Sequence, residues 1–327
     1  MKKFVNHVDS MLRESLTGLV EAHPKLLRVE FEPTFVARRE RASNKVALIS
    51  GGGSGHEPLH AGFVGRGMLD AACPGQVFTS PTPDQMLAAA AAADSGQGVL
   101  FIVKNYAGDC MNFQMASEML AIENTTVLVN DDVAVENSTH TTGRRGVAGT
   151  LIVEKMLGAA AERGAMLADC KVLGDRVNAA TASMGVAFTS CTVPAAGRAT
   201  FDIGPDEIEV GVGIHGEPGR RRAAHMPADA IVKTLLDAIL GDLKAAPGKR
   251  VLLHVNGFGG TPLMELYLLH HLATTRLKSE GLVPLRSLVG NYTTSLEMAG
   301  GSLTVTLLDD ELVSLWDAPV ETAALHW

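Results

Sequence analysis

The sequence predicts an α/β protein of two α/β domains, with mixed, largely parallel sheets and a substrate site at the interface between the domains. Three observations support this fold class. Short apolar strands alternate with helical segments, polar and glycine residues cluster after the strands, and two distant strands each end in a glycine-rich turn that carries a histidine. Alternating strands and helices are typical of parallel sheets, which bind ligands beyond the carboxyl ends of their strands.

Length and composition limit the class of protein. The chain has 327 residues, enough for two domains of ordinary size, and 46% of them are hydrophobic, enough for a buried core. The net charge is −8, without a long block of one sign, which argues against nucleic acid as a partner. Four widely spaced cysteines without a C-x-x-C pair indicate reduced thiols.

The N-terminal segment and the apolar runs bear on localisation. Two lysines near the start are not followed by an apolar segment, so a signal peptide is not expected. No apolar run approaches the ~18 residues that a membrane helix needs. We therefore expect a cytoplasmic protein that does not contact the membrane.

The first domain is expected over residues 1–183. It opens with an amphipathic helix near residues 8–22, and an irregular stretch then leads to a buried strand over residues 45–49. This strand runs into the first glycine-rich turn. A turn at the end of a buried strand puts its side chains at the edge of the sheet where ligands bind.

A strong helix start follows that turn. Thr82 is an N-cap residue, Pro83 occupies the first helical position, and Gln85 stands where a capping box has its second member. The helix is expected to continue through the alanine run at residues 88–93.

The rest of the first domain continues the alternation of strands and helices. The expected elements are a strand over 99–103, a helix from Cys110, a strand over 126–129 and a long helix over 147–162. In the first of these helices, Met111, Met115 and Met119 have the spacing of core residues, so we expect them to be buried.

A change of pattern near residues 180–185 predicts a second domain over residues 184–327. Its expected elements are strands over 185–188, 209–214, 250–255, 303–308 and 311–315, a helix over 229–240 and a helix that opens at residues 261–262. Several of these strands follow one another without an intervening helix. This half is therefore expected to contain some antiparallel sheet.

Two glycine-rich turns present a histidine beside Glu and Pro. The first is Gly51-Gly52-Gly53-Ser54-Gly55-His56-Glu57-Pro58, and the second is Gly213-Ile214-His215-Gly216-Glu217-Pro218-Gly219. Glycine tolerates positive φ and lets the backbone approach a ligand closely. For either histidine alone, a structural histidine in a glycine turn is an equally good interpretation. The repetition of the pattern favours one shared site.

The first turn does not match a nucleotide-binding loop. No lysine follows its glycines as in a P-loop, and His56 occupies the third glycine position of a dinucleotide fingerprint. The turn instead offers backbone N–H groups and a histidine. These groups suit a small, oxygen-rich ligand and proton transfer near neutral pH.

Charged residues follow the next strands. Lys104 and Asp109 flank a short turn, and a carboxylate at a helix N-terminus is stabilised as the anion, which favours Asp109 as acceptor of a hydroxyl proton. Helix capping by Asp109 and a surface ion pair of Lys104 are the alternative interpretations. Asp131 and Asp132 lack a third acidic ligand nearby, so we expect no metal site. The cluster at 220–222 is either a solvated loop or a docking site.

The motifs resemble those of the dihydroxyacetone kinase family, in order and along the whole chain. They are the two glycine-rich turns and the segments 78–84, 104–109, 143–146, 191–195, 260–267 and 315–319. The resemblance covers the substrate-binding part of such kinases. The all-helical nucleotide-binding part of the family is not matched.

The resemblance implies roles for individual residues. His215 would hold a ketone substrate as a covalent hemiaminal. His56 and Asp109 would activate the terminal hydroxyl for attack on a phosphate, so the implied catalytic residues are His56, Asp109 and His215. The implied substrate-binding residues are Gly53, Ser54, Gly55, His56, Lys104 and Asp109.

The resemblance also implies partners. This chain would bind no cofactor itself, and magnesium and ADP or ATP would sit on a separate helical subunit that is recharged from phosphoenolpyruvate through a phosphocarrier relay. Residues 220–222 could meet that subunit, and a homodimer is expected. Two alternatives remain open: an ATP-dependent kinase subunit for erythrulose or another short ketose, and a catalytically silent coactivator that senses dihydroxyacetone.

Overall fold

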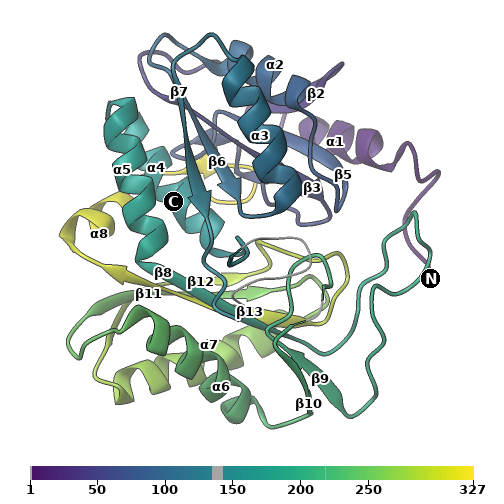
Figure 1. Ribbon diagram of the computed structural model, residues 1–327, viewed down its shortest axis with the longest axis vertical. Coiled ribbons are helices and arrows are strands. Elements are labelled where there is room, and N and C mark those ends of the chain that lie inside the picture. Colours follow the sequence, from purple (N-terminus) through teal and green to yellow (C-terminus); the bar gives the residue numbers. More distant parts are fainter. Residues whose placement is uncertain (1, 135–142, 218) are drawn as a thin grey trace.

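The computed structural model describes residues 2–134, 143–217 and 219–327. It contains two six-stranded mixed sheets, one above the other, with helices on the outer faces and between the sheets (Figure 1). The predicted α/β fold with mixed sheets is therefore confirmed. Among the described helices, none combines the length and the apolar character that crossing a bilayer would require.

The first sheet is parallel over most of its width. Its strands, in spatial order, are β1 (Leu27–Phe31), β2 (Thr34–Arg38), β5 (Ala71–Val77), β3 (Ala47–Ser54), β6 (Val99–Lys104) and β7 (Asn124–Val129). The last four run parallel, because helices α2 (Pro83–Ala93) and α3 (Ala107–Met119) connect them across one face. The first two form an antiparallel hairpin in a stretch predicted to be irregular. The capping box that starts α2 is confirmed, since the Thr82 N–H donates to Gln85 Oε1 at 2.9 Å.

The second sheet has a single parallel pairing, between its last two strands. Its strands, in spatial order, are β10 (Arg221–Ala224), β9 (Glu207–Val210), β8 (Thr181–Ala187), β13 (Gly300–Leu308), β11 (Arg250–Gly257) and β12 (Val283–Gly290). Helices α6 (Ala228–Leu243) and α7 (Leu263–Ser279) cover its outer face (Figure 1). Only the helix α7 makes a crossover between neighbouring parallel strands, so this sheet is more antiparallel than the first.

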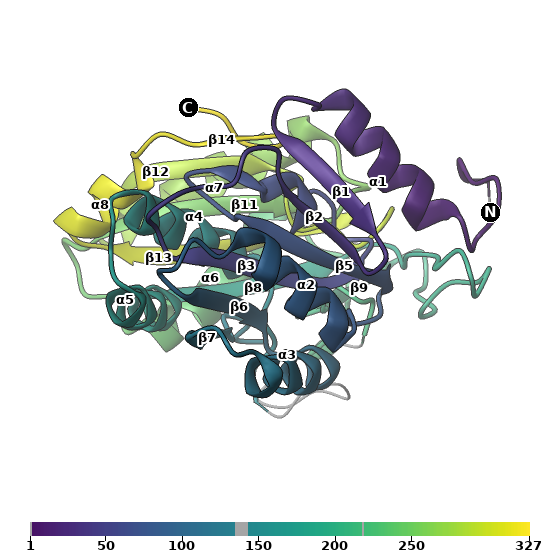
Figure 2. The ribbon, with the colours of Figure 1, turned by 90° about the horizontal axis from the view of Figure 1, so that it is seen from above.

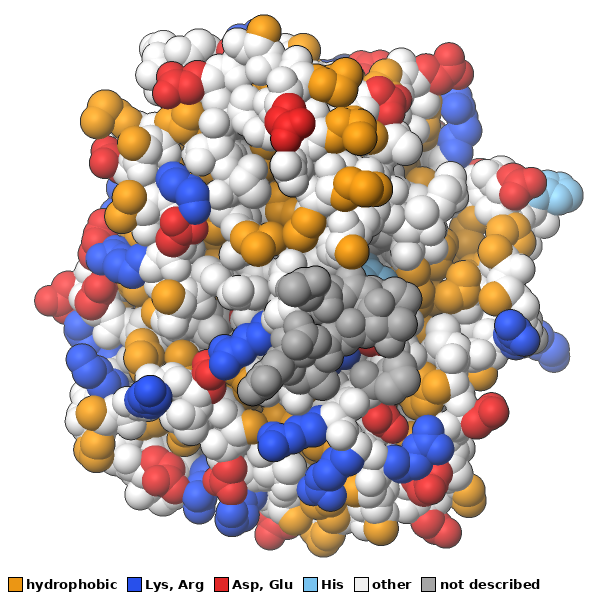
Figure 3. All heavy atoms as spheres, in the orientation of Figure 1, with side chains coloured by type: hydrophobic (Ala, Val, Ile, Leu, Met, Phe, Trp, Pro, Cys, Tyr) orange, Lys and Arg blue, Asp and Glu red, His pale blue; other side chains and the backbone are white. Residues whose placement is uncertain are grey.

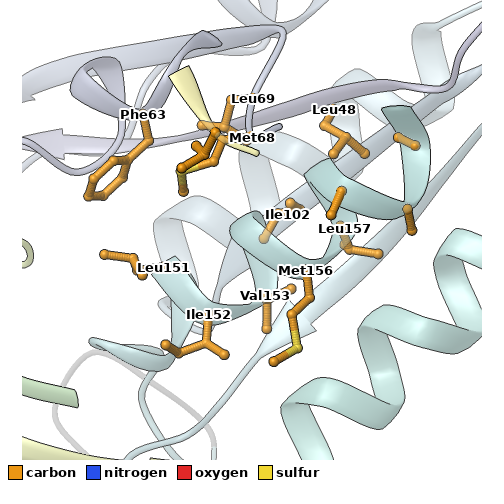
Figure 4. Packing of buried hydrophobic residues seen from close by; sticks show 14 of the residues in the cluster. Leu48, Phe63, Met68, Leu69, Ile102, Leu151, Ile152, Val153, Met156 and Leu157 are labelled. Atoms are coloured by element: carbon orange, nitrogen blue, oxygen red, sulfur yellow. The ribbon is translucent and has the colours of Figure 1, made fainter. Parts of the chain in front are cut away.

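Helix α4 (Gly149–Glu162) lies in the centre of the molecule, with α5 (Leu167–Ala179) beside it. Every residue of α4 except the last is buried, which agrees with its nearly uniform apolar sequence. Its side chains pack against Leu48 and Ile102 of the first sheet and against Phe63 (Figure 4). Viewed from above, the first sheet lies over the second (Figure 2). The two sheets therefore share a central helical layer.

The C-terminal segment returns from the second sheet to the first. Trp316 and Val320 belong to the same buried cluster as Leu48, and β14 (Glu321–Thr322) pairs with β4 (Gly65–Arg66). The short helix α1 (Met11–Ala22) and the 3-10 turn η1 (Ala61–Phe63) complete this side of the molecule. The division at 183/184 falls inside β8 and stays a prediction.

Three local predictions are wrong. The strand expected over 209–214 ends at Val210, and residues 211–214 belong to the glycine-rich turn that leads to His215. The expected strand over 311–315 is the helix α8 (Asp310–Trp316), which Asp309 caps by accepting the Leu312 N–H at 2.8 Å. The expected burial of Met111, Met115 and Met119 is also wrong, since these side chains are 60%, 46% and 63% exposed. Hydrophobic side chains are visible over α3 on the surface drawn in Figure 3. The opposite face of α3, with Phe113 and Ala116, is the one that packs on the sheet.

Candidate active site

A cavity of about 450 Å³ lies between the two sheets, at the carboxyl end of the first. Gly53, Tyr106 and Asp109 line it from the first sheet's side, and Thr200 and His215 line it from the other side. A second cavity, of about 460 Å³, lies behind the glycine-rich strand and beneath α1, with a mostly apolar lining. It contains neither Asp109 nor His215, so the cavity between the sheets is the candidate site.

Glycines in β3 let other groups come close to the strand. A Cβ at Gly52 would overlap the Lys104 ammonium group, and a Cβ at Gly53 would lie 2.7 Å from the Phe78 Cα. These residues therefore have to be glycine for Lys104 and the Phe78 turn to occupy their places. Gly55 has a φ of +104°, a conformation that favours glycine. Ser54 points away from the cavity, because its Oγ donates to Gly75 O at 2.7 Å.

His56 is completely buried beside the cavity. Its Nδ1 lies 2.8 Å from Thr294 O, which assigns the ring proton to Nδ1 and leaves Nε2 as an acceptor. Nε2 has no hydrogen-bond partner in the described part of the chain. Burial, and after it the charges of His215 and Lys104, hold the pKa of His56 well below its usual value. A neutral imidazole with a free acceptor nitrogen can take up a proton.

Lys104 and Asp109 lie together below the glycine-rich strand. The Lys104 side chain is fully buried, and its Nζ lies 3.6 Å from Asp109 Oδ2 and 3.2 Å from Gly51 O. Asp109 stands in the first turn of α3, and its Oδ1 has no hydrogen-bond partner among the described residues. This oxygen is available to a ligand in the cavity.

His215 enters the site from the second sheet's side. Its ring centroid lies 4.7 Å from that of His56 and 4.4 Å from that of Tyr106, both edge-on. The His215 backbone N–H donates to Glu217 Oε2 at 2.9 Å, and its Nδ1 lies 3.8 Å from Glu217 Oε1. Glu217 thus holds the backbone of His215 through a hydrogen bond and places a carboxylate oxygen near its ring.

Buried charges support the His215 turn from behind. The guanidinium of Arg145 contacts Asp132 at 2.7 Å and Glu217 at 3.6 Å. Burial opposes ionisation of Glu217, but the hydrogen bond and charge of His215 and the charge of Arg145 hold its pKa at about 2. Glu217 is therefore ionised at all ordinary pH values.

The structure brings together most of the residues that the sequence predicted for the site. Gly53, Asp109 and His215 line the cavity, and His56 and Lys104 lie directly against its lining. The two carboxylates of the acidic pair have structural partners: Asp131 accepts the Val147 and Gly149 N–H groups, and Asp132 pairs with Arg145. Among the described residues, no group of three or more His, Cys, Asp and Glu side chains is arranged to hold a metal ion. The cluster at 220–222 contributes to the edge strand β10, where Arg222 contacts Glu209.

Several residues around the site were missed by sequence reasoning. They are Tyr106, Thr200, Arg145, Glu217, His60 and Glu154. Two of them lie inside motifs of the sequence: Arg145 belongs to the segment 143–146, and Glu217 belongs to the second glycine-rich turn. Glu154 has no local signal, because it occupies a mid-helix position far in sequence from every other site residue.

The fold and the cavity define a class of α/β proteins with a polar site between two mixed sheets. A family model described as the Dak1 domain matches residues 17–324, so the chain belongs to the Dak1 family.

Similar proteins agree with this assignment. The chain is 46% identical, over 100% of its own length and 99% of the other chain, to the PEP-dependent dihydroxyacetone kinase, dihydroxyacetone-binding subunit DhaK of Escherichia coli (strain K12). It is 50% identical, over 99% of its length and 100% of the other, to the corresponding subunit of PTS-dependent dihydroxyacetone kinase 1 of Listeria innocua.

Solved structures agree as well. The dihydroxyacetone kinase of C. freundii has a TM-score of 0.88 and 36% identity over 98% of this chain and 60% of that one. The dihydroxyacetone kinase operon co-activator Dha-DhaQ has a TM-score of 0.89 and 33% identity over 95% of this chain and 96% of that one.

Proposed function

We propose that this chain is the dihydroxyacetone-binding subunit of a phosphoenolpyruvate-dependent dihydroxyacetone kinase, a phosphotransferase that acts on the terminal hydroxyl of a short ketose. One observation carries the proposal. His56, Asp109 and His215 come from opposite sides of one cavity, in a chain that matches DhaK subunits over its full length.

The first step is covalent capture of the ketone by His215. Glu217 Oε1 lies near Nδ1, which leaves Nε2 as the nucleophile. Nε2 forms a bond to the carbonyl carbon, the carbonyl oxygen takes up a proton, and Nδ1 gives one up, so a neutral hemiaminal forms without loss of water. The bonded nitrogen carries no hydrogen, so the adduct cannot go on to an imine as a lysine adduct would. Glycerol has the hydroxyls but no carbonyl carbon, and it is therefore excluded.

The second step is activation of the terminal hydroxyl. Asp109 Oδ1 and His56 Nε2 are acceptor atoms without a partner among the described residues. Either can take the hydroxyl proton as the oxygen attacks phosphorus, and Lys104 can donate to a substrate hydroxyl beside Asp109. Gly53 lines the cavity and would form the wall against which the ketose lies, and the Ser54-Gly55-His56 turn that follows it would bind the ketose from beside this wall, Ser54 through its backbone because its hydroxyl points away. Phosphoryl transfer needs mainly positioning and charge stabilisation, which such a wall supplies.

The phosphoryl donor belongs to another protein in this proposal. This chain binds no cofactor, and a separate helical subunit carries magnesium and ADP or ATP, supplies the phosphoryl group and is recharged from phosphoenolpyruvate. That subunit docks at the mouth of the cavity, where the arginines at 220–222 lie on the nearby edge strand. We also propose a cytoplasmic location, a homodimer and the two-domain division at 183/184.

Two alternative functions have specific support. The co-activator Dha-DhaQ shares the fold at 33% identity, and a putative 3,4-dihydroxy-2-butanone kinase of Solanum lycopersicum is 43% identical over 100% of this chain and 57% of its own. The complete set of His56, Lys104, Asp109 and His215 favours a catalytic subunit over a silent sensor. The residues named for substrate binding would contact groups that trioses and tetroses share, so they favour neither substrate.

The test is intact-protein mass spectrometry with dihydroxyacetone. The wild-type chain should gain the full mass of the ketone without loss of water, and His215→Ala should gain nothing. His271→Ala is the matched control, because that histidine is exposed on α7. Phosphorylation of the ketone in the presence of a separate nucleotide-binding kinase subunit then tests catalysis. An unmodified wild-type mass at saturating ketone would contradict covalent capture.

A further inference from the structure

A row of buried polar groups leads away from the cavity behind Asp109. Lys104 Nζ lies 2.8 Å from His60 Nε2, and His60 Nδ1 lies 2.6 Å from Glu154 Oε1. All of these side chains are at most 5% exposed. His60 and Glu154 do not line the cavity, and the catalytic steps proposed above do not use them.

Hydrogen-bond chemistry assigns the proton on His60. A lysine ammonium has only donors, so His60 Nε2 must accept from Lys104 and the ring proton must sit on Nδ1. Nδ1–H then donates to Glu154 Oε1. Ser50 Oγ lies 3.0 Å from the same nitrogen, and its own hydrogen has Ile102 O at 2.7 Å and the Glu154 carboxyl group as acceptors, so it can accept from Nδ1–H. Every contact of Nδ1 is thus an acceptor.

This tautomer controls where Lys104 points. If the ring proton moved to Nε2, two donors would face each other at the 2.8 Å separation and the ammonium group would be displaced. Lys104 has little room elsewhere, because it is fully buried and packs on the backbone at Gly52, where a Cβ would overlap it. Its remaining N–H faces Asp109, which lines the cavity, only while His60 accepts from the other side.

We propose that His60 and Glu154 are positioning residues for Lys104: Glu154 fixes the Nδ1–H tautomer of His60, and His60 Nε2 then aims the ammonium group at the ligand in the cavity. The inference rests on the proposed function only in that the ligand is a ketose with hydroxyls. Burial raises the pKa of Glu154 to about 8 despite the opposing charge of Lys104. The Glu154 Oε1 atom accepts from Nδ1–H when the carboxyl group is ionised, and it does so in the neutral form when the carboxyl proton sits on Oε2.

The positioning role of Glu154 consequently depends on its acceptor oxygen and not on its charge. Two substitutions of Glu154 separate these properties. Glu154→Gln keeps an acceptor oxygen, whereas Glu154→Leu has similar bulk and none. The first measurement needs no ligand. In the nitrogen NMR spectrum of histidine-labelled protein, with the His60 signal identified by its loss in His60→Gln, wild type and Glu154→Gln should show the Nδ1–H tautomer. Glu154→Leu should show Nε2–H or a mixture.

The second measurement is the dihydroxyacetone concentration that half-saturates adduct formation on His215. Glu154→Leu should raise it about tenfold, the effect of one lost hydrogen bond to a charged group, and Glu154→Gln should stay within about twofold of wild type. An Nε2–H tautomer in the wild-type protein overturns the inference, even where Glu154→Leu fails to fold. The inference is also overturned if Glu154→Gln and Glu154→Leu raise the half-saturating dihydroxyacetone concentration equally. Failure of any adduct to form in wild type would instead refute the proposed function, while the tautomer result would stand.

Discussion

Replacement of Glu217 by glutamine tests whether its negative charge stabilises the His215 turn. Glu217 is 5% exposed, and its carboxylate accepts the His215 N–H and faces Arg145. Glutamine has the same shape and can accept the same hydrogen bond. The substitution therefore removes the charge and little else.

The expected loss follows from the pKa of Glu217. Folding lowers this pKa from 4.5 to about 2, against the effect of burial, through His215 and Arg145. Because the folded pKa lies below the unfolded one, the stabilisation is complete above pH 4.5 and is lost as the pH falls through 2. This lowering of the pKa adds roughly 3 kcal/mol to the free energy of unfolding at pH 7 and about 1 kcal/mol at pH 3.

Urea unfolding at the two pH values measures this difference. Glu217→Gln should be less stable than wild type by about 3 kcal/mol at pH 7, and the gap should shrink to about 1 kcal/mol at pH 3. The control is Glu123→Gln, an exposed carboxylate at the start of β7, which should change stability by less than about 0.5 kcal/mol. An equal difference in unfolding free energy between wild type and Glu217→Gln at both pH values would refute the reasoning. It would show that glutamine disturbs the packing of the turn and that the lost charge is not the cause.

Three further predictions concern the surroundings of the site. Gly52→Ala should weaken dihydroxyacetone binding about tenfold while the protein stays folded, because its Cβ displaces the flexible end of Lys104; unchanged adduct titration would contradict this. Phe113→Ala should cost about 3–5 kcal/mol in urea unfolding, whereas Met115→Gln on the same helix should cost less than about 0.5 kcal/mol; similar losses would contradict the observed faces of α3. Of the four free cysteines, only the partly exposed Cys110 should react readily with a thiol reagent in the native protein, since Cys73, Cys170 and Cys191 are buried; burial raises the pKa of all four, that of Cys170 to about 11, so access distinguishes Cys110. Cys110→Ser should abolish the fast reaction, and a persisting fast phase would show a second accessible thiol.

The position of the site could be predicted from the sequence because it depends on local features. His56, Lys104 and Asp109 each follow a buried strand, and β3 and β6 are parallel neighbours, so their carboxyl ends meet at one edge. His215 is different, because it lies in the glycine-rich turn after β9, a strand whose neighbours β8 and β10 are antiparallel to it, and its signal is the turn itself. Each of these residues is recognisable within about ten residues of its own strand.

The groups that support the site could not be predicted in this way. Thr294 accepts from His56 across 238 positions, and Glu154 contacts His60 across 94. Such contacts depend on how the layers pack, and no local pattern encodes that packing. The strand predicted over 311–315 failed for a related reason, because a short apolar run fits a helix or a strand equally well until its cap is considered.

The predicted position of Asp109 at the site contradicts the predicted burial of the methionines of α3. A spacing of four residues identifies a helix face, but Asp109, Phe113 and Ala116 share a face just as Met111, Met115 and Met119 do. Two positions apart on a helix are separated by about 200°, so Asp109 and Met111 cannot both point inward. Once Asp109 is assigned to the cavity, the methionine face must be the exposed one, as its exposure of 46–63% bears out. The placement of a single carboxylate at the cavity therefore determines which side of the helix packs on the sheet, and residue spacing alone does not.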